Sequence, residues 1–407
     1  MPVGLSDKMP ELFPIAGMRL SSVRAGIKKR AGHDLVLIEL DEGCKTAAVF
    51  TKNDFCAAPV TLAKAHLIAH QPKVLMINSG NANAGTGEAG MAAAQATCMI
   101  AAKLIGCASE QILPFSTGVI GELLPVTPFE TGVPAAIVEL SVNGWAAAAR
   151  GIMTTDIVPK AVSKKIDIDG HAVTITGIAK GSGMIHPNMA TMLGYVATDA
   201  AVSLPLLQKM LTDATDDSFN SITVDGDTST NDACTLTATG RSTLPEITDV
   251  YSPAYTQLSE AITAVLTELA TMIVRDGEGA TKFITIRVEE AATKEEAKQV
   301  GFTIAHSPLV KTAFFASDPN WGRILAAVGR AGLDSLNLTA IRLYLGDACI
   351  VENGGRSPSY TEEQGVAVMK ESEITITVKL ARGSAAATIY TCDFSYDYVK
   401  INAEYRS

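Results

Sequence analysis

The stretch Lys180-Gly-Ser-Gly-Met-Ile-His-Pro-Asn-Met-Ala-Thr191-Met-Leu-Gly-Tyr-Val-Ala197 runs from a glycine-rich loop into an apolar, strand-like segment. Pro187 and Asn188 favour a turn, and Thr191 opens the strand that follows. A threonine hydroxyl is a weak nucleophile at neutral pH and needs a base beside it. Cutting the chain before Thr191 would supply that base, because a free α-amine has an ordinary pKa of about 7.7 to 8.0. The stretch therefore allows a self-processed threonine nucleophile, although a threonine that opens a strand is more often structural.

Several blocks resemble one known family, in order from near residue 46 to the C-terminus. His186-Pro-Asn-Met-Ala-Thr-Met-Leu193 is similar to the processing site of the ornithine acetyltransferase (glutamate N-acetyltransferase) family, whose members cut themselves between Ala and Thr. The other similar blocks are Thr46-Ala-Ala-Val-Phe-Thr-Lys-Asn53, Ile77-Asn-Ser-Gly-Asn-Ala-Asn-Ala84, Ser116-Thr-Gly-Val-Ile-Gly121, Met153-Thr-Thr-Asp156, Arg275-Asp-Gly-Glu-Gly-Ala-Thr-Lys282 and Ser317-Asp-Pro-Asn-Trp-Gly-Arg323.

The resemblance implies cleavage between Ala190 and Thr191, with Thr191 as the catalytic nucleophile. It assigns Thr117 and Gly118 to an oxyanion hole, where a hydroxyl and a backbone N–H stabilise the negative charge of a tetrahedral intermediate. Ser407 stands where a threonine is expected, but it keeps the hydroxyl. The resemblance implies that substrate is bound by Thr154, Lys180, Thr191, Glu278, Asn402 and Ser407.

The same residues also have structural interpretations. Thr117-Gly118 follows an expected strand end at residues 112–115 and could be an ordinary turn. Lys180 could be a solvated loop lysine, whereas a single positive charge suits the carboxylate of an amino-acid substrate. Glu278 could be an exposed carboxylate in a Gly-rich turn, whereas its charge would complement the extra amine of ornithine.

Three further residues are ambiguous. Thr155 could be confused with Thr154, and Asp156 could be a capping residue. His186 is the histidine nearest the expected nucleophile, where it could assist processing or shape the turn.

Composition limits the class of protein. The 407 residues exceed the usual size of a single core, so two lobes or a multilayer sandwich are expected. A net charge of -10 argues against a nucleic-acid surface. Seven cysteines without a CxxC pair indicate reduced thiols, and the start of the chain lacks the pattern of a secretory signal. The alanine-rich stretch 91–108 is broken by Gln95 and Lys103 and is expected to be a helix outside any membrane, so a cytoplasmic protein is predicted.

Apolar periodicity predicts alternating strands and helices on both sides of Thr191, and hence a layered α/β body with mixed sheets and flanking helices. The family resemblance implies that this body is a sandwich of the self-processing N-terminal nucleophile type. No Pro-rich or Gly/Ser-rich linker is evident, so residues 1–190 and 191–407 are expected to form one co-folded unit as an α chain and a β chain. Strands are predicted at 34–40, 46–50, 73–77, near 222, 283–288, 373–379 and 386–394, and helices at 60–69, 87–105, 134–152, 204–215 and 253–273.

Three motifs suggest other chemistry but fit it poorly. Gly85-Thr-Gly-Glu-Ala-Gly90 has dinucleotide-binding spacing, but seven residues separate it from the preceding strand, where a tight turn is needed. Asp225-Gly-Asp-Thr-Ser-Thr-Asn-Asp232 lacks the glycine and glutamate placements of a calcium loop and is expected to be a turn near the active site. His66 and His70 lack the glutamate of a zinc HExxH motif. No cofactor and no metal are therefore expected.

The sequence and the resemblance together predict acetyl transfer from N-acetylornithine to glutamate through an acetyl-Thr191 intermediate, in arginine biosynthesis. The expected assembly is an (αβ)2 heterotetramer that binds neither nucleic acid nor membrane. The sequence leaves open whether acetyl-CoA also donates acetyl groups. A related self-processing aminopeptidase or amidohydrolase would pass the acyl group to water, and a binding protein for small amino acids would never cut.

Overall fold

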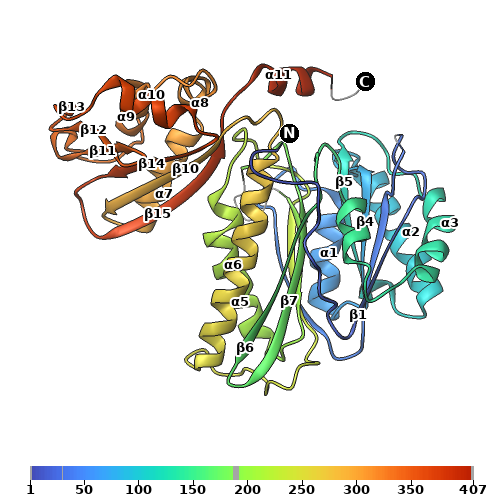
Figure 1. Cartoon of the computed structure of the whole chain (residues 1–407). Coiled ribbons are helices and arrows are strands. Elements are labelled where there is room, and N and C mark those ends of the chain that lie inside the picture. The colour runs from blue at the N-terminus through green and yellow to red at the C-terminus, as the bar shows by residue number, and fades with distance from the viewer. Residues whose placement is uncertain (1, 30, 187–191, 405–407) are drawn as a thin grey trace.

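The protein is an α/β structure built on three sheets (Figure 1). The computed structural model describes residues 2–29, 31–186 and 192–404. A four-stranded and a five-stranded sheet form the body of the molecule, and a six-stranded sheet forms a lobe to one side. The predicted layered α/β arrangement of mixed sheets with flanking helices is confirmed.

The first sheet is formed by strands from the N-terminal part of the chain, in the order β1-β2-β4-β5. Its strands β1, β2 and β4 are antiparallel, and β4 pairs with β5 in parallel. One face packs on helices α2 and α3, and the other faces the second sheet, with α1 and α4 contributing to the core between them. The bounds are β1 Met18–Val23, β2 Leu35–Leu40, β4 Val74–Asn81, β5 Ile112–Val119, α1 Ala58–Ala69, α2 Gly87–Ile105, α3 Thr127–Val138 and α4 Trp145–Gly151.

The second sheet has the order β3-β9-β8-β7-β6, and its outer face is covered by α5 and α6. Together with the first sheet it makes four layers: helices, sheet, sheet, helices. Buried apolar side chains fill all three spaces between the layers. The bounds are β3 Lys45–Phe50, β6 Lys160–Ile168, β7 His171–Lys180, β8 Leu193–Thr198, β9 Ala233–Ala238, α5 Leu204–Asp217 and α6 Pro253–Arg275.

Helix α6 lies next to α5 in the outer helical layer of the body (Figure 1). Ser252 caps its start by accepting a hydrogen bond from the Tyr255 backbone N–H, and Pro253 occupies the first turn. Among helices of the described ranges, α6 alone is long and apolar enough to cross a membrane by length and composition. Leu258, Ile262 and other apolar residues of α6 are buried in the core against the sheet, which is the pattern of a core helix.

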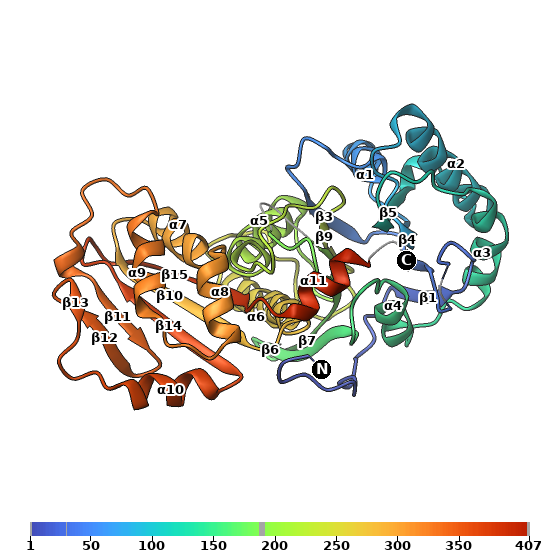
Figure 2. The ribbon, with the colours of Figure 1, turned by 90° about the horizontal axis from the view of Figure 1, so that it is seen from above.

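The third sheet has its own core and the order β13-β12-β11-β14-β10-β15. After it, α11 leads the chain back over the body (Figure 2). The bounds are β10 Phe283–Ala291, β11 Arg342–Leu345, β12 Ala348–Glu352, β13 Gly355–Arg356, β14 Glu373–Lys379, β15 Ala385–Cys392, α7 Lys294–Ala305, α8 Pro308–Phe315, α9 Trp321–Gly329, α10 Glu362–Lys370 and α11 Tyr396–Ala403.

Three details of the predicted elements were wrong. The helix expected at 134–152 is two helices, α3 and α4, because the chain turns at 139–144 between them. The strand expected near Ile222 is an isolated bridge to Tyr390 that follows a short 3-10 helix. Thr117 and Gly118 lie within β5 and do not follow its end.

Candidate active site

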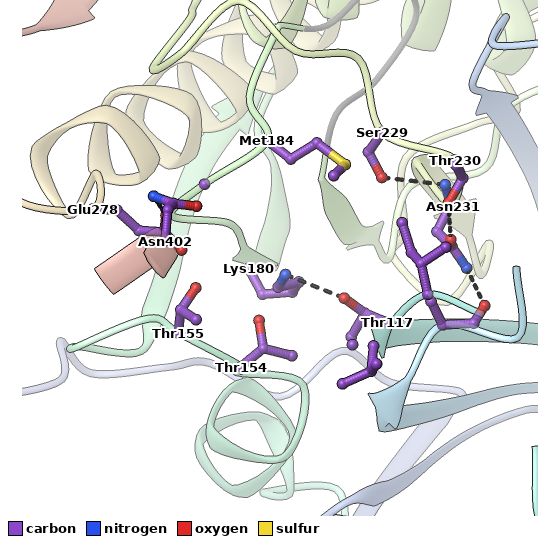
Figure 3. A pocket seen from close by; sticks show the side chains of 15 residues that line it. Thr117, Thr154, Thr155, Lys180, Met184, Ser229, Thr230, Asn231, Glu278 and Asn402 are labelled. Atoms are coloured by element: carbon purple, nitrogen blue, oxygen red, sulfur yellow. Dashed lines mark hydrogen bonds between the residues drawn. The ribbon is translucent and has the colours of Figure 1, made fainter. Parts of the chain in front are cut away.

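A cavity of about 220 Å³ opens where β5 and β7 end and several loops converge (Figure 3). The expected cleavage residues Ala190 and Thr191, and the C-terminal Ser407, lie outside the described residues. Every predicted site residue that the structure does describe lines this cavity: Thr117, Gly118, Thr154, Lys180, Glu278 and Asn402.

The last residues of β5 form one wall of the cavity. Gly118 has a φ of +136°, and a Cβ atom there would lie 2.3 Å from the backbone carbon of Gly80 on β4. A glycine is therefore required for β5 to approach β4 this closely. Asn231 fixes the same strand, since its Nδ2 donates to the Ser116 carbonyl at 3.0 Å. The wall is thus a rigid backbone edge with the Thr117 hydroxyl beside it.

Lys180 ends β7 and lies between Thr117 on one side and Glu278 on the other (Figure 3). Its Nζ donates to Thr117 Oγ1 at 3.2 Å. Burial lowers the pKa of Lys180, while nearby carboxylates, including those of Asp156 and Asp232, oppose that shift. The ammonium group is thus placed to attract an anionic substrate group and to hold the Thr117 hydroxyl.

Glu278 supplies the negative charge on the opposite side of the cavity. The interpretation of Glu278 as an exposed carboxylate is wrong, because the residue is only 6% exposed. Its Oε2 accepts from Asn402 Nδ2 at 2.9 Å, and burial raises its pKa. Gly183 faces it so closely that a Cβ atom at Gly183 would lie 2.4 Å from the Glu278 carboxyl. Two residues 124 positions apart in the chain thus form one polar corner.

The segment 229–231 lines the cavity and is absent from the predicted site residues. Ser229, Thr230 and Asn231 contribute to its wall, and Thr155 lines it next to Thr154. The only sequence signal for this segment was its run of polar side chains, which indicated a turn near the active site.

Asp232 lines a smaller cavity of about 30 Å³ that shares Thr117 and Lys180 with the larger one. Burial raises its pKa well above the ordinary range, and its Oδ2 has no hydrogen-bond partner among the described residues. Met192, which follows the predicted nucleophile, lines this small cavity as well. Met192, the first described residue after position 191, therefore lies at the site.

His186 lies beside His306 and Phe302, with ring centroids 4.3 Å and 5.1 Å away. Burial lowers its pKa. It is not among the residues that line the cavity. The structure thus places it in a ring cluster next to the loop that precedes position 187.

Comparisons with known proteins identify the family of this chain. Residues 19–407 match the model of the ArgJ family. This chain belongs to the ArgJ family. It is 54% identical over 407 residues to the arginine biosynthesis bifunctional protein ArgJ of Pseudomonas fluorescens, covering 100% of both chains. The protein of the same name from Methylococcus capsulatus is 57% identical over 396 residues, covering 97% of each chain.

Among solved structures, this ArgJ-family chain is similar to ornithine acetyltransferase from Mycobacterium tuberculosis complexed with ornithine. The two are 34% identical, and the match covers 44% of this chain and 94% of the solved one with a TM-score of 0.38.

Proposed function

We propose that this ArgJ-family protein transfers the acetyl group of N-acetylornithine to glutamate, through an ester on Thr191 that forms after the chain has cut itself between Ala190 and Thr191. The observation that carries the proposal is the convergence of Thr117, Gly118, Thr154, Lys180, Glu278 and Asn402 on one cavity. Family membership over residues 19–407 supports the same chemistry.

The first half-reaction uses the hydroxyl of Thr191 as the nucleophile. Its α-amine, freed by the cut, takes the hydroxyl proton as the oxygen attacks the acetyl carbonyl of N-acetylornithine. The backbone N–H of Gly118 and the hydroxyl of Thr117 stabilise the oxyanion, with Lys180 fixing the threonine at 3.2 Å. The C–N bond then breaks, and ornithine leaves with the proton on its amine.

In the second half-reaction, the amine of glutamate attacks the ester and releases Thr191 as N-acetylglutamate forms. Donor and acceptor both carry an α-carboxylate, which Lys180 can attract. The side-chain ammonium of the donor matches Glu278, the carboxylate on the far side of the cavity. Because one amide is exchanged for another, the cycle requires no redox cofactor.

Acetyl-CoA is proposed as a second acetyl donor, since the curated relatives are called bifunctional. The α chain 1–190 and β chain 191–407 are proposed to stay associated as an (αβ)2 heterotetramer in the cytoplasm. These three proposals go beyond the contacts of the site and have separate tests: labelled acetyl-CoA with glutamate, the mass of the native assembly and cell fractionation.

The decisive experiment follows the chain and its products together. Purified protein should separate on a denaturing gel into fragments of about 20 and 23 kDa, which add up to the 42.6 kDa of the chain. N-terminal sequencing of the larger fragment should begin Thr-Met-Leu-Gly. Incubation with N-acetylornithine and glutamate should yield ornithine and N-acetylglutamate. Acetate in place of N-acetylglutamate would favour an amidohydrolase, and an uncut chain with full transfer activity would contradict the proposal.

A further inference from the structure

A fully buried ion group lies behind the candidate site without lining its cavity. The ammonium of Lys160, at the start of β6, is 2.6 Å from Asp156 Oδ1 and 2.6 Å from Asp276 Oδ2. All three side chains have no exposed surface. A buried charge is costly unless it is paired and hydrogen-bonded, so an arrangement of this kind requires close mutual contacts.

Asp156 ties the ion group to two segments of the cavity wall. Its Oδ2 accepts a hydrogen bond from the Thr154 backbone N–H at 3.0 Å. Its Oδ1 accepts one from the Gly181 backbone N–H at 2.8 Å. The turn that presents Thr154 and the loop that begins at Lys180 are therefore held by one carboxylate. Asp156 is thus more than the local capping residue that its sequence suggested.

Asp276 ties the same group to the third segment. Its Oδ2 accepts from the backbone N–H groups of Ile157 and Val158, at 3.0 and 3.3 Å. Its own carbonyl accepts from Ser182 Oγ at 2.6 Å, and the Ser182 carbonyl accepts from the Glu278 N–H at 2.8 Å. The loop that carries Glu278 is thereby locked to the loop that follows Lys180.

We infer that Lys160, Asp156 and Asp276 act as a positioning node that holds Thr154, Lys180 and Glu278 at their places around the substrate. The inference rests on the proposed function, because it takes those three residues as substrate contacts. The described hydrogen bonds of the Lys160 ammonium go to Asp156, Asp276 and the Val158 carbonyl, none of which lines the cavity, so Lys160 acts through the two carboxylates it joins. One ammonium thus sets the relative position of three loops from distant parts of the chain.

The charges of the node favour this role. Burial raises the pKa of Asp156, but the ammonium groups of Lys160 and Lys180 outweigh burial and hold its pKa well below the ordinary value. Burial raises the pKa of Asp276 in spite of Lys160. Removing the Lys160 charge would leave two buried carboxyl groups without the cation between them, and they would separate or take up a proton. Either change displaces the backbone N–H groups they hold.

The test compares Lys160→Met with Lys164→Met. Lys164 lies on the same strand and pairs with Glu268 at 3.0 Å, but both side chains of this pair are exposed to solvent in part. Hydrogen–deuterium exchange should become faster in residues 154–158, 180–183 and 276–279 of Lys160→Met, and in none of them in Lys164→Met. The KM for N-acetylornithine should rise at least tenfold in Lys160→Met and stay at the wild-type value in the control.

Faster exchange confined to β6, or an unchanged KM in folded Lys160→Met, would overturn the inference. Should Lys160→Met not fold, Asp156→Asn serves in its place. Both carboxylate oxygens of Asp156 accept from backbone N–H groups, and an amide NH2 cannot accept, so the variant loses the negative charge and one of the bonds to Thr154 and Gly181. It should then loosen the same three segments and raise KM severalfold, and failure to do so would equally overturn the inference. If wild-type protein transfers no acetyl group, the proposed function fails, and the exchange pattern still decides whether the node exists.

Discussion

Replacing Gly118 by alanine would test the oxyanion wall with a single methyl group. At its φ of +136°, the new Cβ atom would lie 2.3 Å from the backbone carbon of Gly80 and 2.6 Å from the nitrogen of Asn81. Ordinary contacts of this kind are 3.4 to 4 Å, so the two backbone segments must separate by about 1 Å. Flexible side chains cannot absorb this shift, because both contacts are with backbone atoms of the neighbouring strand.

The size of the effect follows from that displacement. A misplacement of about 1 Å can reduce a rate by roughly 10²-fold. Loss of one oxyanion donor costs about 10² to 10³ in kcat. We expect kcat to fall by about 10² to 10³, with a smaller change in KM, because an oxyanion donor acts mainly in the transition state. The positive φ adds strain of about 1 to 3 kcal/mol, which should lower the thermal midpoint.

Gly121→Ala is the matched control. Gly121 also has a positive φ, +84°, but a Cβ atom there would meet nothing within 4 Å. This variant should lose stability through strain and keep its kcat. Ornithine release would be measured at saturating N-acetylornithine and glutamate, and rates would be normalised to the fraction of cleaved chain on a denaturing gel. A folded, cleaved Gly118→Ala enzyme with the wild-type kcat would refute the assignment of this backbone to the oxyanion hole.

Three more predictions concern the chemistry. Thr191→Ala should abolish both cutting and transfer, and Thr191→Ser should keep part of each, because the proposal assigns both reactions to one hydroxyl. Denaturing gels measure the cutting and product analysis measures the transfer, and near wild-type turnover in the alanine variant would contradict the assignment. Lys180→Met and Glu278→Gln should each raise KM roughly tenfold, a loss of about 1.4 kcal/mol of binding. Burial raises the pKa of Glu278, so the wild-type KM for N-acetylornithine should rise as pH falls through that raised value and the carboxylate loses its charge. Glu278→Gln should not show this rise in KM at low pH. Unchanged kinetics in both Lys180→Met and Glu278→Gln would show that these charges do not bind substrate. In the absence of glutamate, N-acetylornithine should acetylate the peptide that begins at Thr191, forming a hydroxylamine-labile ester, and up to one equivalent of ornithine per site should be released. If no such ester forms and double-reciprocal plots of the steady-state rates intersect, the ping-pong mechanism is wrong.

Local sequence signals predicted most elements of the body. The alanine-rich helix was expected at 87–105 and α2 spans Gly87–Ile105, because an apolar stripe and a following Gly106 in the left-handed conformation define it locally. The expected helix 134–152 was wrong because the chain turns at residues 139–144 and brings α4 against β1. The Asn143-Gly144 dipeptide just before α4 is a local turn signal, which apolar periodicity alone does not register.

For the site, too, the sequence predicted single residues but not how the folded chain arranges them. The family resemblance predicted the charged and hydroxyl residues of the site individually, but these residues line one cavity only because three loops meet in the folded chain. The burial of Lys160 could not be expected from sequence, because Lys160-Ala-Val-Ser-Lys-Lys-Ile-Asp resembles an ordinary charged strand. Its partner Asp276 is 116 positions away, so only the folded chain pairs them.

The position of the predicted cut within the second sheet explains how cleavage could serve catalysis without dismantling the enzyme. In the order β3-β9-β8-β7-β6, strands β8 and β9 follow position 191, and they are flanked on both sides by strands that precede it. Lys180 at the end of β7 pairs with Leu193 at the start of β8, so a break between residues 190 and 191 would open only the connection between two neighbouring strands. The cavity likewise draws Thr117 and Lys180 from one side of the break and Glu278 and Asn402 from the other. Two fragments arranged in this way keep a complete site only while they remain paired, which is why we expect them to purify together and to lose transfer activity together when they are separated.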